Sequence, residues 1–175
     1  SLRRQRQMCI RDRMDTVQEV KDGNRKLVFR GQRLAFSTSK TSRSKGRWIE
    51  FELYITDNGG YVLSRVGQTR FVHSVDCPTV TRNKLDRMSL DTVGSFQGLY
   101  LCPDCEISLQ RDEEFCPEVP RYWAMKFFAA EDVVDALHKQ DRNGNMYLTN
   151  VARDLLEEAA EQDSEIARVY YNDEI

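Results

Sequence analysis

Apolar and polar residues alternate in several stretches of the first half of the chain, as they do in β-strands that bury one face. The clearest case is residues 47–56 (RWIEFELYIT), in which Trp48, Phe51, Leu53 and Ile55 are the apolar members. Similar β-branched and aromatic content predicts three more strands, over residues 26–36, 61–66 and 70–75. We therefore expect an antiparallel sheet of about four strands.

Two segments between these strands are polar. Residues 57–60 (DNGG) tolerate positive φ angles, which favours a tight hairpin turn. Residues 37–46 (STSKTSRSKG) form a loop whose side chains are hydroxyl-bearing or basic. Its basic residues are Lys40, Arg43 and Lys45, and Arg47 follows directly. This basic group is a candidate phosphate or nucleic-acid contact, although a solvated hairpin loop is the simpler expectation.

The last third of the chain has helical periodicity. Residues 121–128 (RYWAMKFF) predict one more strand, and the apolar residues after it recur at helical spacing. One helix is expected over residues 131–139, a second from an N-cap at Thr149 or Asn150, and a short third from Ser164. Strands followed by helices predict an α+β fold, an antiparallel meander with C-terminal helices.

The segment between the first two helices begins like a calcium-binding loop, because Asp141, Asn143 and Asn145 occupy alternate positions. Such a loop needs glycine at its sixth place and glutamate at its twelfth. Met146 and Ala152 occupy those places here. We therefore predict a tight turn without calcium.

The first thirteen residues (SLRRQRQMCIRDR) differ in origin from the rest in our interpretation. Back-translated, most of them match the reading frame of a transposase-adapter oligonucleotide used in sequencing libraries, so we treat residues 1–13 as an assembly artefact. The whole chain has a net charge of −2, but without this segment 21 basic residues face 27 acidic ones, a net charge of −6. A mildly acidic protein gives no electrostatic reason to expect broad nucleic-acid binding.

Two closely spaced pairs of metal-ligating residues stand in the middle of the chain. His73 and Cys77 form an H-x3-C pair, Cys102 and Cys105 form a C-x2-C pair, and 24 residues separate the two. Zinc takes four nitrogen or sulfur ligands in tetrahedral geometry, and a short C-x2-C turn lets two thiolates reach one ion. The sequence thus predicts a structural zinc site, inserted like a zinc knuckle, at His73, Cys77, Cys102 and Cys105.

Around these ligands, over about residues 70–105, the chain resembles the metal-binding module of Ada-type DNA-repair proteins and related small zinc modules. In that family a C-x3-C pair is followed by C-x2-C on a small sheet-and-helix scaffold, and His73 stands here at the position of the first cysteine. The resemblance implies a zinc-dependent fold and a ligand role for the four residues, and no further role is transferred.

Three alternatives to this ligand set stay open. Cys116 is the fourth ligand if His73 is a core histidine. In the second alternative the C-x2-C pair is a redox motif, although residues 106–110 (EISLQ) do not open a convincing helix that would lower a thiol pKa. In the third alternative the cysteines are buried, inert thiols. The second histidine, His138, is expected at the surface of its helix.

Three functions are compatible with these patterns. The first is a non-enzymatic, zinc-stabilised protein that binds a macromolecule, with a protein partner favoured by the acidic charge. The second is a nucleic-acid-binding or damage-response module that uses the basic loop beside aromatic strands. The third, a zinc enzyme, requires an open metal position and a base such as Asp76 or Asp104. Four aromatic residues could stack bases on an exposed sheet, but core packing is their ordinary role. They are Trp48, Tyr54, Tyr61 and Phe71.

We expect one domain in three parts. Residues 14–109 form the β-rich zinc-binding region, residues 110–120 (QRDEEFCPEVP) an acidic linker or loop, and residues 121–175 the strand and helices. No apolar run is long enough to span a bilayer, and no targeting signal is recognisable, so a cytoplasmic location and no membrane partner are the default expectations.

Overall fold

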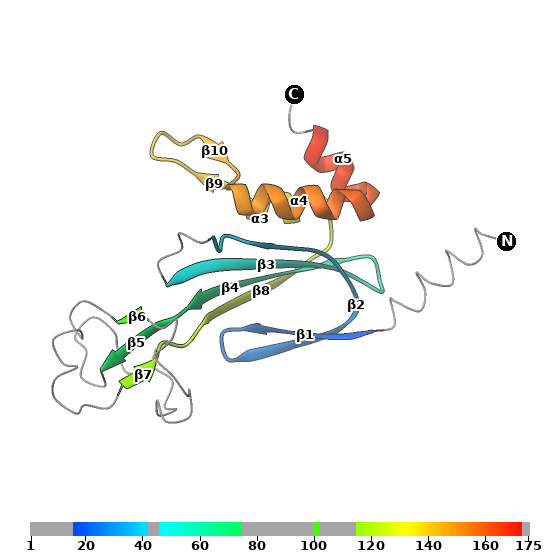
Figure 1. Cartoon of the computed structure of the whole chain (residues 1–175). Coiled ribbons are helices and arrows are strands. Elements are labelled where there is room, and N and C mark those ends of the chain that lie inside the picture. Colours follow the sequence, from blue (N-terminus) through cyan, green and yellow to red (C-terminus); the bar gives the residue numbers. More distant parts are fainter. Residues whose placement is uncertain (1–15, 42–45, 75–99, 102–114, 173–175) are drawn as a thin grey trace. The chain divides into compact units, whose positions relative to one another are not determined.

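A computed structural model describes residues 16–41, 46–74, 100–101 and 115–172 of the chain (Figure 1). The adapter-like segment 1–13 lies outside these residues. The main sheet has five strands in the order β1-β2-β3-β4-β8 and is antiparallel. Its strands are β1 (Val17–Asp22), β2 (Arg25–Thr38), β3 (Arg47–Thr56), β4 (Tyr61–Thr69) and β8 (Arg121–Phe127). The predicted α+β class and antiparallel sheet are confirmed, and β1 is a strand that the sequence pattern did not indicate. The strand predicted over residues 70–75 does not extend this sheet, because residues 71–74 pair in a separate sheet.

The long strand β2 pairs with two partners in succession. Its first part, up to Arg30, pairs with β1, and from Gly31 onward it pairs with β3, where Gly31 is opposite Thr56. A Cβ atom added at Gly31 would lie 2.2 Å from the main-chain oxygen of Ile55. Glycine is therefore required where β2 passes from one partner to the other, because no side chain fits there.

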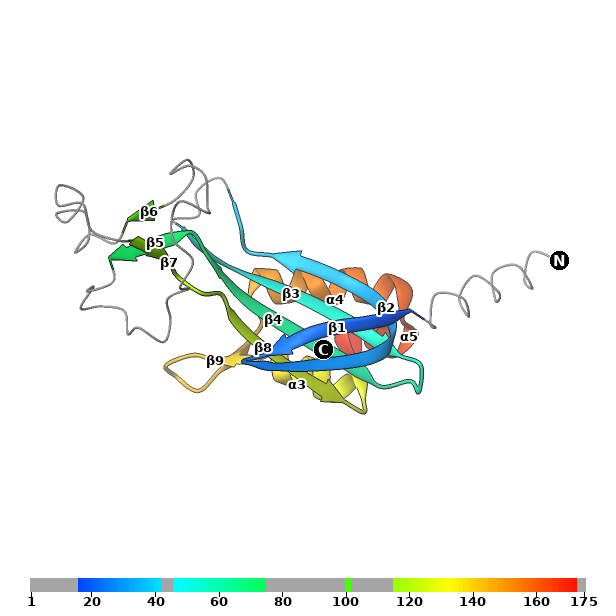
Figure 2. The same ribbon diagram turned by 90° about the horizontal axis from the view of Figure 1, so that it is seen from below.

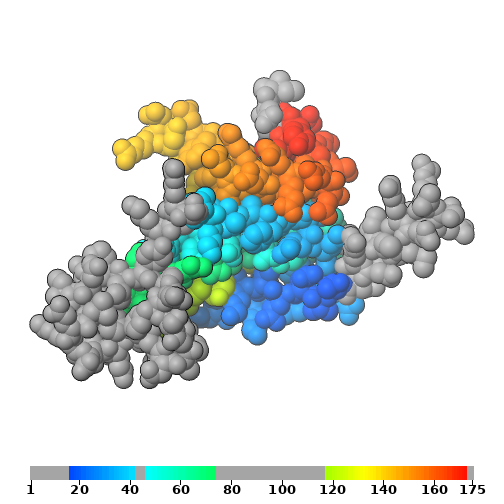
Figure 3. All heavy atoms as spheres, viewed as in Figure 1, coloured from blue at the N-terminus to red at the C-terminus, as the bar shows by residue number. Residues whose placement is uncertain are grey.

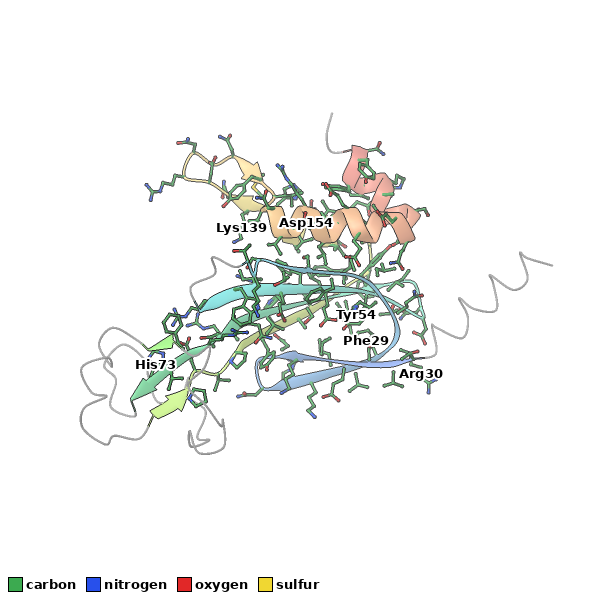
Figure 4. The ribbon with its side chains drawn as sticks, in the orientation of Figure 1. Phe29, Arg30, Tyr54, His73, Lys139 and Asp154 are labelled. Atoms are coloured by element: carbon green, nitrogen blue, oxygen red, sulfur yellow. The ribbon has the colours of Figure 1, made fainter. Side chains whose placement is uncertain are left out.

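The change of partner curls the sheet, so that the β1–β2 hairpin lies on the opposite side of β3 and β4 from the helices (Figures 1 and 2). The edges of the curl meet where the N–H of Gly23 donates to the carbonyl of Tyr122 at 2.8 Å. Inside the curl, the rings of Phe29 and Tyr54 pack edge to face at a centroid distance of 5.2 Å (Figure 4). Val20, Val62 and Ala124 complete this small core.

Three helices cover the other side of the sheet (Figure 3). They are α3 (Ala130–Leu137), α4 (Asn150–Gln162) and α5 (Ser164–Asn172). As predicted, Thr149 caps α4, its hydroxyl accepting from the N–H of Ala152 at 3.3 Å. Leu155, Leu156 and Ile166 are fully buried, which accounts for the helical spacing of apolar residues. None of the helices in the described residues is long and apolar enough to cross a membrane.

Helix α4 is bound to β2 by polar contacts as well as apolar ones. The Ser37 hydroxyl donates to the carbonyl of Val151 at 2.8 Å, and the Gln162 side chain donates to the carbonyl of Leu34 at 3.0 Å. Before α4, the predicted tight turn is present between two short strands, β9 (Lys139–Gln140) and β10 (Met146–Tyr147). The side chain of Asp141 accepts from the N–H groups of residues 143 and 145, and the N–H of Asp141 donates to the carbonyl of Asn145, so the turn is closed by its own side-chain and backbone groups.

The chain divides into two compact units. The first consists of residues 1–39, 50–66 and 122–175, and the second of residues 40–49 and 67–121. The second unit contains a small sheet in the order β6-β5-β7, formed by β5 (Phe71–Ser74), β6 (Tyr100–Leu101) and β7 (Phe115–Pro117). Strand β7 lies in the segment 110–120 that the sequence predicted as a linker or loop. Its three residues form a strand because they pair with β5, and the local sequence pattern does not predict this pairing.

Candidate functional site

The candidate site is built on β5, which has neighbours on both sides. Strand β6 runs parallel to it, with Leu101 paired to Val72. Strand β7 runs antiparallel to it, with Cys116 directly opposite His73. These pairings bring together the backbone of three segments that are separated by long stretches of sequence.

His73 is almost completely buried on β5, with 2% of its side chain exposed (Figure 4). Its Nε2 atom lies 2.9 Å from Oε2 of Glu118. A carboxylate oxygen only accepts, so Nε2 carries a proton, and in the neutral form of the ring Nδ1 is then the nitrogen with the lone pair. Nδ1 is the one buried side-chain nitrogen or oxygen atom without a hydrogen-bond partner in the part of the chain that the structure describes.

Glu118 anchors this histidine. Its side chain is 7% exposed, and the same Oε2 atom also accepts from Nη2 of Arg47 at 2.8 Å. Burial alone would raise the pKa of Glu118, but the hydrogen bonds from His73 and Arg47 outweigh it and hold that pKa below its usual range. The carboxylate is therefore ionised at neutral pH and fixes the orientation of the imidazole.

The four predicted ligands divide between described and undescribed parts of the chain. His73 is described, whereas Cys77, Cys102 and Cys105 lie outside the described residues. Cys116, the alternative ligand, is described by its backbone alone. No group of three histidine, cysteine or acidic side chains able to bind a metal occurs within residues 16–41, 46–74, 100–101 and 115–172. The proposed metal site thus stays a prediction.

A second cluster surrounds Trp48 in the same unit. Nζ of Lys40 lies 4.7 Å from the centroid of the Trp48 ring, and the guanidinium carbon of Arg70 lies 5.4 Å from it. The guanidinium carbon of Arg47 lies 4.8 Å from the centroid of the Phe71 ring. We call Lys40, Arg47, Trp48, Arg70 and Phe71 the basic–aromatic surface. Of the predicted loop contacts it includes Lys40 and Arg47, while Arg43 and Lys45 lie outside the described residues.

The backbone explains how this surface forms. The N–H of Arg70 donates to the carbonyl of Gly46 at 2.7 Å, which brings the start of β5 alongside the start of β3. Gly46 adopts a φ of 78°, a left-handed conformation that glycine adopts at little cost. Trp48 and Arg70, which are distant in sequence, become neighbours as a result.

The other aromatic candidates are core residues. Tyr54 and Tyr61 are 5% and 4% exposed, so neither ring is available to stack a base. The Tyr54 hydroxyl donates to Glu52, and the Tyr61 hydroxyl donates to Asp163. His138 is the C-cap residue that follows α3, and its Nδ1 donates to the carbonyl of Val134 at 2.8 Å.

Glu118 is the site residue that the sequence did not single out. It lies in an acidic stretch (QRDEEFCPEVP) where one glutamate looks like the next. Its position two residues after Cys116 is a weak signal at best, because the contact with His73 spans 45 residues.

Comparison with known proteins gives no relative. No protein-family model, no curated protein and no solved structure matches the chain.

Proposed function

We propose that residues 40–49 and 67–121 fold around one structural Zn²⁺ ion and that the protein is a non-enzymatic module that binds a macromolecule. The proposed ligands are Nδ1 of His73 and the thiolates of Cys77, Cys102 and Cys105, as the H-x3-C and C-x2-C pairs predict. The observation behind the proposal is the buried, unpartnered Nδ1 of His73.

A buried polar atom without a partner is uncommon in folded proteins and needs an explanation. Metal-bound histidines donate their other ring N–H to a carboxylate or carbonyl, which fixes the tautomer and makes the ligating nitrogen more basic. His73 has this arrangement, because Nε2 donates to Glu118 and the lone pair of Nδ1 is left for another partner. A Zn²⁺ ion would supply that partner.

The pairings of β5 support the rest of the ligand set. Cys102 directly follows Leu101, which pairs with Val72, the residue before His73. His73 and Leu101 therefore belong to neighbouring strands, and Cys102 is the next residue along the chain. Cys116 is opposite His73 in register, so it is a fifth candidate for four places.

With four protein ligands the ion would have no open position for water, which is why we propose a structural role. Its binding free energy would then contribute directly to the folding of this unit. Eighteen residues of this unit have a described burial, and three of them, Gly46, Val72 and His73, are buried. A metal would add to the small core that these described residues form.

The test is the zinc content of the full chain after expression with zinc, measured by inductively coupled plasma mass spectrometry. We expect one Zn per chain in the wild type and a loss of most of it in His73→Ala. His138→Ala is the matched control, because His138 belongs to the other unit, and it should keep its zinc. Cys9→Ser is the corresponding cysteine control, since Cys9 lies in the adapter-like segment.

The zinc contents of the wild type and the variants decide whether the metal site exists and which residues are its ligands. Less than about half a zinc per chain in the wild type refutes the metal site. If His73→Ala keeps a full equivalent of zinc and Cys116→Ser loses it, His73 is a core histidine and Cys116 is the fourth ligand. His73→Cys guards against simple misfolding, because a cysteine there restores the ligand pattern of the Ada-type modules and should restore zinc binding.

A further inference from the structure

The two units differ in charge, which the net charge of the whole chain conceals. The second unit, residues 40–49 and 67–121, contains ten Lys and Arg against nine Asp and Glu. The first unit, counted from residue 14, contains eleven against eighteen. The acidity that argues against nucleic-acid binding therefore belongs mostly to the first unit, and repulsion of a polyanion by the second is weak.

Within the described residues of the second unit the balance is more basic. Lys40, Arg47, Arg70 and Arg121 are its basic residues, and Glu118 is its one carboxylate. Glu118 is buried and already accepts hydrogen bonds from His73 and Arg47. Its negative charge is compensated by Arg47, so this pair adds little net charge at the surface.

The basic–aromatic surface combines two features that single-stranded nucleic acids need. Lys40, Arg47 and Arg70 are exposed, and their charged groups lie within 5.4 Å of the centroids of Trp48 or Phe71. Trp48 is half-buried at the start of β3, so the fold holds the residue while part of its surface stays exposed. Exposed bases stack on such rings, and neighbouring cations contact the phosphates.

We infer that the basic–aromatic surface binds single-stranded nucleic acid, with a base stacked on Trp48 and phosphates contacted by Lys40 and Arg70. This inference rests on the proposed binding module and names its partner. It does not require that the ion itself touch the ligand. Duplex DNA is excluded as the preferred form, because its bases are not free to stack on a side chain.

The test uses fluorescence anisotropy with fluorescein-labelled dT20 and U20 oligonucleotides at low salt. Because residues 1–13 contain five arginines, the protein is a full-length variant in which Arg3, Arg4, Arg6, Arg11 and Arg13 are all changed to serine. We expect saturable binding of single strands, weaker binding of a matched duplex, and a tenfold or greater loss of affinity in Trp48→Ala. Lys40→Gln and Arg70→Gln should each reduce the slope of log K against log [salt] by about 0.7.

Two controls separate stacking from simple charge. Arg142→Gln removes an exposed positive charge from the β9–β10 turn of the other unit and should leave the affinity unchanged. In Trp123→Phe, Trp48 is the sole tryptophan, so quenching of its fluorescence by the oligonucleotide reports stacking directly. Zinc content and circular dichroism of every variant show whether lost binding reflects lost folding or lost metal.

Failure of this inference is distinguishable from failure of the metal site. A zinc-loaded, folded protein that does not bind dT20 or U20 at low salt overturns it. So does equal affinity in Trp48→Ala and the parent. Equal binding of a poly-glutamate peptide would indicate an acidic protein partner and would also overturn it. A parent protein that holds less than about half a zinc per chain but still binds the oligonucleotides would refute only the metal proposal.

Discussion

The strongest test of the local chemistry is the substitution Glu118→Gln. It keeps the size of the side chain but removes the negative charge. That charge lies on the carboxylate that accepts hydrogen bonds from His73 Nε2 at 2.9 Å and from Arg47 Nη2 at 2.8 Å. The contact with His73 is buried on both sides, and a buried hydrogen bond to a charged group contributes about 1.5–3 kcal/mol. The Arg47 side chain is 58% exposed, so its ion pair with Glu118 contributes about 0–1 kcal/mol.

We therefore expect Glu118→Gln to lower the free energy of unfolding of this unit by about 2 kcal/mol, since the amide oxygen still accepts one hydrogen bond. Arg47→Gln is the matched variant and should cost about 0.5 kcal/mol. The assay is urea unfolding in a Trp123→Phe background, in which Trp48 reports on this unit alone. Equal costs for the two variants, or less than about 0.5 kcal/mol for Glu118→Gln, would refute the reasoning.

The same pair of variants has a defined pH dependence. The folded-state pKa of Glu118 lies below its ordinary value of 4.5, so its ionised form is the one that folding favours. Its contribution to stability is fully present above that ordinary value and is lost as the pH falls through the folded pKa. The part of the difference between wild type and Glu118→Gln that is due to the carboxylate charge should shrink as the pH falls below about 4.5.

Three further outcomes are expected. Gly31→Ala places a Cβ atom 2.2 Å from the main-chain oxygen of Ile55 and should cost about 3 kcal/mol in urea unfolding; a stable variant would show that the change of strand partner does not need glycine. Burial raises the pKa of Tyr54 and of Tyr61 well above the usual value. Tyr54→Phe and Tyr61→Phe should therefore not change the step in absorbance at 295 nm that other tyrosines give up to about pH 11. The neutral hydroxyls of Tyr54 and Tyr61 stabilise the fold below pH 10, and this contribution is lost at more alkaline pH. After chelation of the metal, the Trp48 fluorescence of the Trp123→Phe protein should change at a lower urea concentration than the circular dichroism of the helices. A single urea transition for both signals would contradict a metal confined to one unit.

Local pattern alone determined most of the secondary structure. The strand over residues 47–56 has the predicted bounds, and the helix capped by Thr149 begins where its side chain and apolar spacing indicated. Alternation and capping are properties of neighbouring residues, so they are legible without the rest of the chain. Strand β1 was not predicted from the sequence, because its six residues (VQEVKD) are mostly polar and half of them are exposed. It forms a strand through its pairing with β2.

The arrangement of the candidate site depended on tertiary structure. His73 and Cys116 were visible in the sequence as possible ligands, but only the register of β5 with β7 makes them neighbours. Glu118 gained its role from a contact across 45 residues, and Trp48 gained its two cations from segments on either side of it. Such contacts depend on how strands pair and on which groups become buried together. Neither is encoded in the spacing of a motif, because pairing energy and desolvation arise only when distant segments meet.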